Sequence, residues 1–296
     1  VRDGGLKPKS KTNDYFFNAA KAFGVGKVTG IDLPSELSGR LPNRTWKQNW
    51  FEQNKDFYCN YQQRAKKQDL TRYLIEIARE NCLDGNKVRA GDAVNFSIGQ
   101  GDTLVTPIRL AQMYAAIAND GLYYKPQIAR AIVDADGEIV KEFKPEVADK
   151  IEIEQSTWDF LHRGLRMVVT RGTAAGVFSG FPVAVSGKTG TAQVFGKNPN
   201  GSAKDDTSWF ASYGPTENPQ YAVVMMVSQG GFGASTSGLG VRNIYETLFG
   251  VSGNKVNPEK AVFPNGVPST IAKVDLKKVA AKVDLTGVKV GGVKLK

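Results

Sequence analysis

The chain has 296 residues, 41% of them hydrophobic and 23% charged, which are ordinary values for a globular protein with a sizeable core. Its net charge of +10 is concentrated at the end, because residues 252–296 contain nine Lys and only three acidic residues. The body carries little excess charge, so a nucleic-acid-binding surface is not expected.

The first part of the chain is predicted to be mostly helical. A short helix is expected over residues 15–23, and Gly24 and Gly26 after it mark its end. Residues 45–86 are polar, aromatic and charged with helical patches, which indicates an inserted helical region. Thr106 as N-cap and Pro107 at the first helical position start a further helix over residues 106–118.

The second part alternates strands with two helices. Residues 127–143 read as a hairpin around an Asp-Gly turn, and residues 155–170 form a strongly amphipathic helix. Three strand candidates follow at residues 184–195, 208–213 and 221–228. Short turns join them, so we expect them to pair antiparallel, with a last helix at 241–249 covering them. The order of elements predicts an α+β fold.

Cysteine and histidine are scarce in this sequence. Cys59 and Cys82 can form one disulfide in an oxidising compartment or remain two buried thiols, and both alternatives stay open. With a single histidine, no zinc site can be assembled from His and Cys, and we expect no metal. We interpret His162 as a surface residue of a helix and not as a member of a Ser-His-Asp triad.

The run S-G-K-T-G-T at residues 186–191 is compatible with different functions. A phosphate-binding P-loop requires a Gly at position 182, which is Pro182, and the next residues favour a strand over a helix. A glycine-rich turn between strands is the plain structural alternative. The third interpretation is the K-T-G strand of penicillin-interacting enzymes.

Several short segments resemble, in the same order, the transpeptidase domain of class B penicillin-binding proteins, most closely the elongation type. They are G-I-D-L-P-S-E at 30–36, S-I-G-Q-G at 97–101 with T-P at 106–107, A-I-A-N-D-G at 116–121 with Pro126, G-T-A at 172–174, K-T-G-T-A-Q at 188–193, W-F at 209–210 and the strand at 221–228. The resemblance covers about residues 12–250. It implies a serine β-lactamase-like fold, an antiparallel sheet flanked by helices plus an all-helical half. To that half we assign the helices that start at Thr106 and Gln155.

The resemblance also implies a site on the K-T-G strand. Lys188 and Thr189 would hold the carboxylate of a stem peptide or β-lactam, with charge from the ammonium and a hydrogen bond from the hydroxyl. Gly190 lets the acyl chain lie against the strand, and the Thr191 N–H would donate to the oxyanion. The second family motif, S-x-N, aligns so that Asn13 matches its Asn and is a candidate catalytic residue with Lys188 and Thr191.

The nucleophile is the main departure from the family pattern. Lys11 stands where S-x-N has its Ser, with Ser10 beside it, so the roles of both stay open. No S-x-x-K precedes Asn13, where the family order places it, so we expect the nucleophile to lie upstream of Val1 or to have been removed. One hypothesis is a peptidoglycan D,D-transpeptidase seen without its nucleophile. The alternative is a non-catalytic stem-peptide-binding or scaffolding homologue, with a P-loop nucleotide binder as a weak third.

Further expectations concern organisation and surroundings. We divide the chain into an unplaced segment 1–11, a partial transpeptidase domain 12–251 and a basic tail 252–296, which is mobile or adds one strand. The resemblance implies peptidoglycan stem peptides and β-lactams as ligands and no cofactor. It also implies a glycosyltransferase and cell-wall elongation proteins as partners. The expected location is the extracytoplasmic face of the bacterial plasma membrane, through an anchor missing from this chain.

Overall fold

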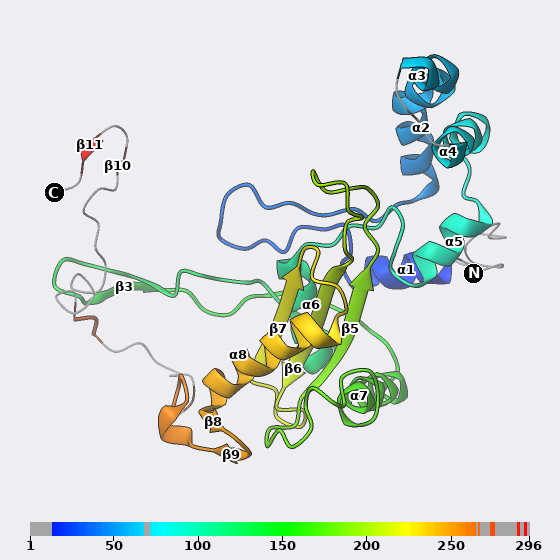
Figure 1. Ribbon diagram of the computed structural model, residues 1–296. Coiled ribbons are helices and arrows are strands. Elements are labelled where there is room, and N and C mark those ends of the chain that lie inside the picture. Colours follow the sequence, from blue (N-terminus) through cyan, green and yellow to red (C-terminus); the bar gives the residue numbers. More distant parts are fainter. Residues whose placement is uncertain are drawn as a thin grey trace.

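The computed structural model describes residues 14–67, 72–264, 266, 273–275, 289–290 and 293–294. At its centre is an antiparallel sheet of order β5-β6-β7, shown in Figure 1. Its strands are β5 (Ser186–Ala192), β6 (Thr207–Gly214) and β7 (Tyr221–Val227). The three predicted strands are confirmed. The P-loop and glycine-turn interpretations are wrong, because Gly187 and Lys188 lie inside an antiparallel strand and not at a helix start or in a turn.

Helices cover both faces of this sheet, as predicted. Successive β6 residues point to opposite faces, so Phe210 packs on one side while Ala211 and Tyr213 pack on the other. Figure 1 shows α8 across the near face and α6 behind the sheet. The core under α8 includes Phe178, Val185, Phe210, Val241 and Tyr245. The core under α6 and α7 includes Tyr114, Ile117, Trp158, Leu165 and Tyr213.

The sheet-covering helices are α6 (Pro107–Ala118), α7 (Gln155–Thr170) and α8 (Leu239–Phe249), the last preceded by the π-helical turn η3 (Ala234–Gly238). The Thr106 hydroxyl accepts the N–H of Arg109, which confirms the predicted N-cap. Assigning α6 and α7 to an all-helical half was wrong. Both pack directly on the sheet, because their large buried side chains complete the core around Tyr213.

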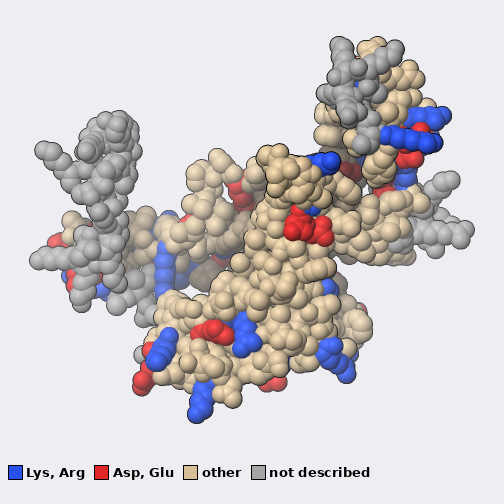
Figure 2. All heavy atoms as spheres, viewed as in Figure 1, with Lys and Arg blue, Asp and Glu red and all other residues tan. Residues whose placement is uncertain are grey.

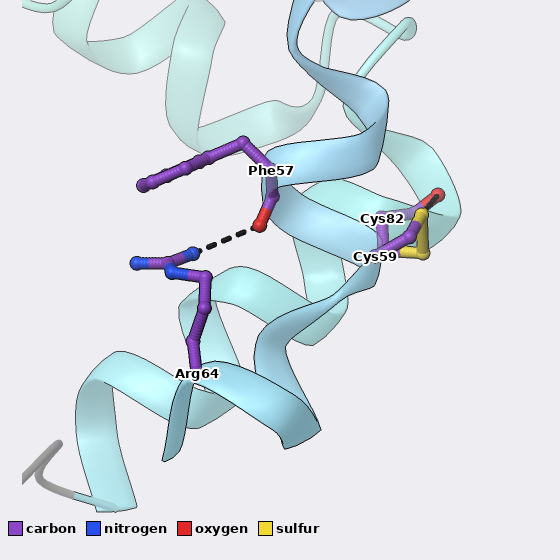
Figure 3. The surroundings of a disulfide bond; sticks show 4 residues. All are labelled: Phe57, Cys59, Arg64 and Cys82. Carbon is purple, nitrogen blue, oxygen red and sulfur yellow. Dashed lines mark hydrogen bonds between the residues drawn. A yellow bond between two sulfur atoms is a disulfide. The ribbon is translucent and has the colours of Figure 1, made fainter. Parts of the chain in front are cut away.

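A separate group of helices contains the predicted insertion. It consists of α2 (Arg44–Cys59), α3 (Tyr61–Lys67) and α4 (Arg72–Asp84), which pack on one another away from the sheet (Figure 1). A disulfide joins Cys59 at the end of α2 to Cys82 in α4, with Cα atoms 4.8 Å apart (Figure 3). Beside the disulfide, the Arg64 guanidinium of α3 donates to the Phe57 carbonyl of α2 at 2.9 Å. Of the two alternatives for the cysteines, the disulfide is therefore the one realised.

Shorter elements surround these units. The helix α1 (Tyr15–Ala22) was predicted, whereas α5 (Ala90–Ser97) was not. The predicted hairpin is β2 (Ala131–Val133) with β3 (Ile139–Glu142), and an unpredicted pair is β1 (Leu122–Tyr124) with β4 (Val147–Lys150). The described chain end contains β8 (Val251–Ser252) with β9 (Lys255–Val256), the turn η4 (Pro258–Lys260), and β10 (Lys289–Val290) with β11 (Val293–Lys294).

The described parts of the tail make local contacts. Val262 donates its N–H to the carbonyl of Leu248 in α8, and Lys273 lies 2.6 Å from Glu138 beside the β2–β3 turn. One expected alternative was that the tail adds a single strand to a sheet. The structure instead pairs β10 antiparallel with β11, within the tail itself. The boundary between body and tail stays a prediction, as do the other domain limits.

Two further features of the described residues concern helix length and surface charge. No helix within the described ranges is long and apolar enough to cross a membrane. On the face in Figure 2, described Lys and Arg residues are interspersed with Asp and Glu. This mixed surface gives no continuous basic stripe on that face for the phosphates of a nucleic acid to follow.

Candidate active site

The K-T-G residues lie on β5, one of the two outer strands of the described sheet, at the side of a cleft. Lys188 and Gly190 pair opposite Ala211 and Trp209 of β6, which places these residues on the face covered by α6. Between β5 and α6 the cleft has a volume of about 250 Å³. Its opposite wall is formed by Leu110, Met113 and Tyr114 of α6 and by residues 98–100 of the preceding loop.

The Lys188 ammonium and the Thr189 hydroxyl meet at the strand edge. Lys188 Nζ donates to the Thr189 carbonyl oxygen at 2.8 Å and to Thr189 Oγ1 at 3.3 Å. The Lys188 side chain is exposed, so its third N–H faces solvent. An ammonium and a hydroxyl this close together can both donate to one carboxylate, as the K-T-G interpretation requires.

The two threonines of the strand are held from the α8 side. Thr189 Oγ1 lies 2.8 Å from the hydroxyl of Thr173, in the turn after α7. Thr191 Oγ1 accepts the N–H of Gly233 at 3.2 Å, at the entry to η3. Thr173 was not predicted as a site residue. The only available signal was the G-T-A segment at residues 172–174.

Two glycines here lie close to neighbouring segments. A Cβ on Gly190 would come within 3.0 Å of Trp209 Cβ, and one on Gly233 would lie 2.4 Å from the Gly190 carbonyl oxygen. Larger residues at either place would push η3 or β6 away from β5. The absence of side chains therefore keeps the strand close to its neighbours and leaves its cleft side open.

Two groups of predicted or possible site residues fall elsewhere. Asn13, Ser10 and Lys11 lie outside the described residues, so the proposed S-x-N alignment stays a prediction. The chain has one S-x-x-K spacing, Ser252 to Lys255, which lies after Asn13 and so does not follow the family order. These two residues face each other across the β8–β9 hairpin at the end of α8, and neither lines the cleft.

His162 lies on the helix α7, as predicted, but it is only partly exposed and both of its ring nitrogens have hydrogen-bond partners. Its side chain is 25% exposed, with Nδ1 2.6 Å from the Tyr213 hydroxyl and Nε2 2.9 Å from Asp120 Oδ1. Burial raises the pKa of Tyr213, so this phenol stays protonated at neutral pH. The histidine thus joins α7 to β6 and to the end of α6, and its two partners do not form a Ser-His-Asp arrangement.

Comparison with known sequences identifies similar proteins. A family model described as the penicillin binding protein transpeptidase domain matches residues 9–246. Penicillin-binding protein 2A of Bacillus subtilis is 30% identical over 222 residues, covering 72% of this chain and 25% of the relative. Peptidoglycan D,D-transpeptidase MrdA of Escherichia coli is 30% identical over 227 residues, covering 73% of this chain and 30% of the relative. The chain thus spans between a quarter and a third of these relatives.

Solved structures give the same result for the fold. The crystal structure of Pseudomonas aeruginosa PBP2 in complex with WCK 5153 aligns with a TM-score of 0.57 and 28% identity, over 83% of this chain and 47% of that chain. A peptidoglycan synthase complex that coordinates polymerization and crosslinking aligns with a TM-score of 0.54 and 28% identity, over 80% of this chain and 33% of that chain. These similarities agree with the predicted fold class.

Proposed function

Since this chain belongs to the family of penicillin-binding protein transpeptidase domains, we propose that its Lys188 cleft serves a peptidoglycan D,D-transpeptidase. The reaction is acyl transfer through a serine acyl-enzyme, which β-lactams block by acylating the same serine. One observation carries the proposal. The Lys188 ammonium and the Thr189 hydroxyl converge at the edge of β5, beside a cleft of about 250 Å³.

Each residue of the strand has a distinct part in this proposal. Lys188 and Thr189 bind the terminal carboxylate of a D-Ala-D-Ala stem peptide or of a β-lactam. Gly190 leaves room for the acyl chain, and the Thr191 N–H stabilises the oxyanion of the tetrahedral intermediate. We assign Asn13 to the same site through its match to the family's S-x-N motif.

The serine itself is proposed to come from residues outside these 296. The cleft is not lined by the one S-x-x-K spacing of the chain, and the family order places that motif before Asn13. A stem-peptide receptor without catalytic activity remains the alternative function, because the carboxylate-binding edge needs no serine to bind. The presence or absence of S-x-x-K upstream of Val1 distinguishes the two.

A transpeptidation assay tests the proposal. A form of the protein that carries S-x-x-K upstream of Val1 should form cross-linked muropeptides from peptidoglycan substrate, and penicillin should abolish the cross-links. Binding of stem peptide without any cross-linked product would favour the receptor. Loss of both binding and cross-linking would reject a role of the cleft in peptidoglycan chemistry.

Location and partners follow from the same proposal. The Cys59–Cys82 disulfide supports an oxidising, extracytoplasmic location, where a membrane anchor outside this chain would hold the domain. We propose a glycosyltransferase as partner, because a similar solved structure belongs to a complex that couples polymerization to crosslinking. Other cell-wall elongation proteins are proposed from the resemblance to elongation-type relatives.

A further inference from the structure

A buried lysine connects the helical group to the loop beside the cleft. Lys47 of α2 is only 8% exposed. Its Nζ lies 3.0 Å from Asp102 Oδ2 and 3.5 Å from Asp92 Oδ2. One ammonium therefore holds α2, α5 and the loop that follows α5. Because both carboxylates share this cation, removing it would leave Asp102 without its ion-pair partner and Asp92 with Arg89 alone, whose Nε lies 3.7 Å from Asp92 Oδ2.

The loop at residues 98–102 forms one wall of the cleft. Its first three residues line the cleft, and Gln100 Oε1 accepts the N–H of Gln193, just beyond β5, at 3.2 Å. A second pocket, lined by Lys47, Asp92 and residues 100–102 among others, lies against the same loop. The loop thus lies between the Lys188 cleft and the ion pairs of Lys47 with Asp92 and Asp102.

A backbone clamp fixes the far end of this loop. Arg40 Nε donates to the Asp102 carbonyl oxygen at 2.6 Å. The backbones of Arg40 and Leu104 exchange hydrogen bonds at 2.8 and 3.0 Å. Arg40 also stacks on the Trp46 ring of α2, 4.6 Å from its centroid, so it links the backbone of the loop to α2. The Asp102 side chain adds an ion pair between the loop and α2.

We propose that Lys47 is a positioning residue for the cleft: through Asp102 it holds the 98–102 loop at the separation from β5 that ligand binding needs. Lys47 does not line the cleft, so it acts through the loop and not on the ligand. The inference rests on the proposed function for its consequence in acylation, but the hold on the loop is testable without it.

Hydrogen exchange on the 296-residue chain tests the hold directly. Asp102→Asn keeps the side-chain shape and leaves Lys47 paired with Asp92, so the chain should still fold. Exchange of the Gln193 amide and of the loop amides should speed up about tenfold, while the Phe210 amide in β6 keeps its rate. Lys87→Met, which removes an exposed ion pair with Asp84, serves as the matched control and should change none of them. Unchanged exchange at Gln193 would overturn the proposal.

Acylation kinetics test the consequence in a form of the protein that carries S-x-x-K. Asp102→Asn and Lys47→Met should each raise the half-saturating penicillin concentration about tenfold, with the acylation rate constant within about twofold of wild type. The double variant Lys47→Met/Asp102→Asn should have the same half-saturating concentration as either single variant. Lys47→Arg keeps the positive charge, so its half-saturating concentration should stay close to that of the wild type. An equal loss in both constants, or additive losses, would contradict positioning. If the wild type is not acylated, the proposed function fails and the exchange result alone decides on Lys47.

Discussion

At residue scale, the Lys188–Thr189 contact leads to a graded prediction. Thr189→Val removes one hydrogen bond to a bound carboxylate, so acylation by a fluorescent penicillin should slow about tenfold. Lys188→Ala also removes the positive charge, and we expect a loss of about a hundredfold or more. The measurement is the second-order labelling rate in a form of the protein with S-x-x-K. Lys204→Ala, at another exposed lysine, should label at the wild-type rate. Equal rates for all three variants would refute carboxylate binding at this edge.

A second prediction at residue scale concerns acid stability. Asp32 accepts the N–H groups of Ile128 at 2.7 Å and Ala129 at 2.9 Å, and these bonds, Ile128 first, hold the pKa of Asp32 below its ordinary value of 3.8. A carboxyl with a lowered folded-state pKa contributes stability above its unfolded pKa and loses it as the pH falls through the folded value.

Asp32→Asn should therefore lower the urea midpoint at pH 7, with the gap to wild type closing as the pH falls below 3.8. Asp205→Asn, at an exposed carboxyl elsewhere, is the control and should show no such gap. A difference in urea midpoint for Asp32→Asn that stays constant from pH 7 to pH 2 would show that the charge of this carboxylate does not stabilise its contact with Ile128 and Ala129.

At the scale of elements, the sequence predicted helices and strands that have a strong local signal and missed the short paired strands. The cap at Thr106 and the apolar run at 221–228 predicted α6 and β7 because each signal is local. The strands β1 and β4 have three and four residues, and β4 is exposed throughout, so no alternation marks them. The packing of α6 and α7 on the sheet depends on which apolar faces meet, and a helix pattern does not specify its partner.

The disulfide-closed helices allow an element-scale prediction. Cys59 and Cys82 are 23 residues apart, and closing such a loop contributes about 3 kcal/mol in the chain-entropy model. Replacing both by Ser should expose α2–α4 to limited proteolysis while the amides of β6 keep their exchange protection. Treatment of the wild type with a reductant should reproduce the cleavage pattern. Unchanged resistance to protease would mean that packing alone holds these helices.

At the scale of the whole molecule, the candidate site combines the strand β5, which the sequence predicted, with cleft walls that the sequence did not predict. Residues 188–191 were identified from a motif whose chemistry is carried by consecutive side chains. Thr173 contacts Thr189 from the α8 side of the strand, and residues 98–100 form a wall of the cleft, through contacts across 16 and 93 positions of sequence. Such contacts leave no local pattern, so the sequence indicated the K-T-G strand as a candidate site and not the shape of the cleft around it.

The most direct test of the account is covalent labelling with a fluorescent penicillin, followed by denaturation and peptide mapping. Electrostatic stabilisation by Lys188–Thr191 does not form a covalent bond by itself, so the 296-residue chain should remain unlabelled. A form of the protein with S-x-x-K upstream of Val1 should be labelled at that serine. Label on the 296-residue chain itself, at Ser10, Ser252 or any other serine, would contradict the account.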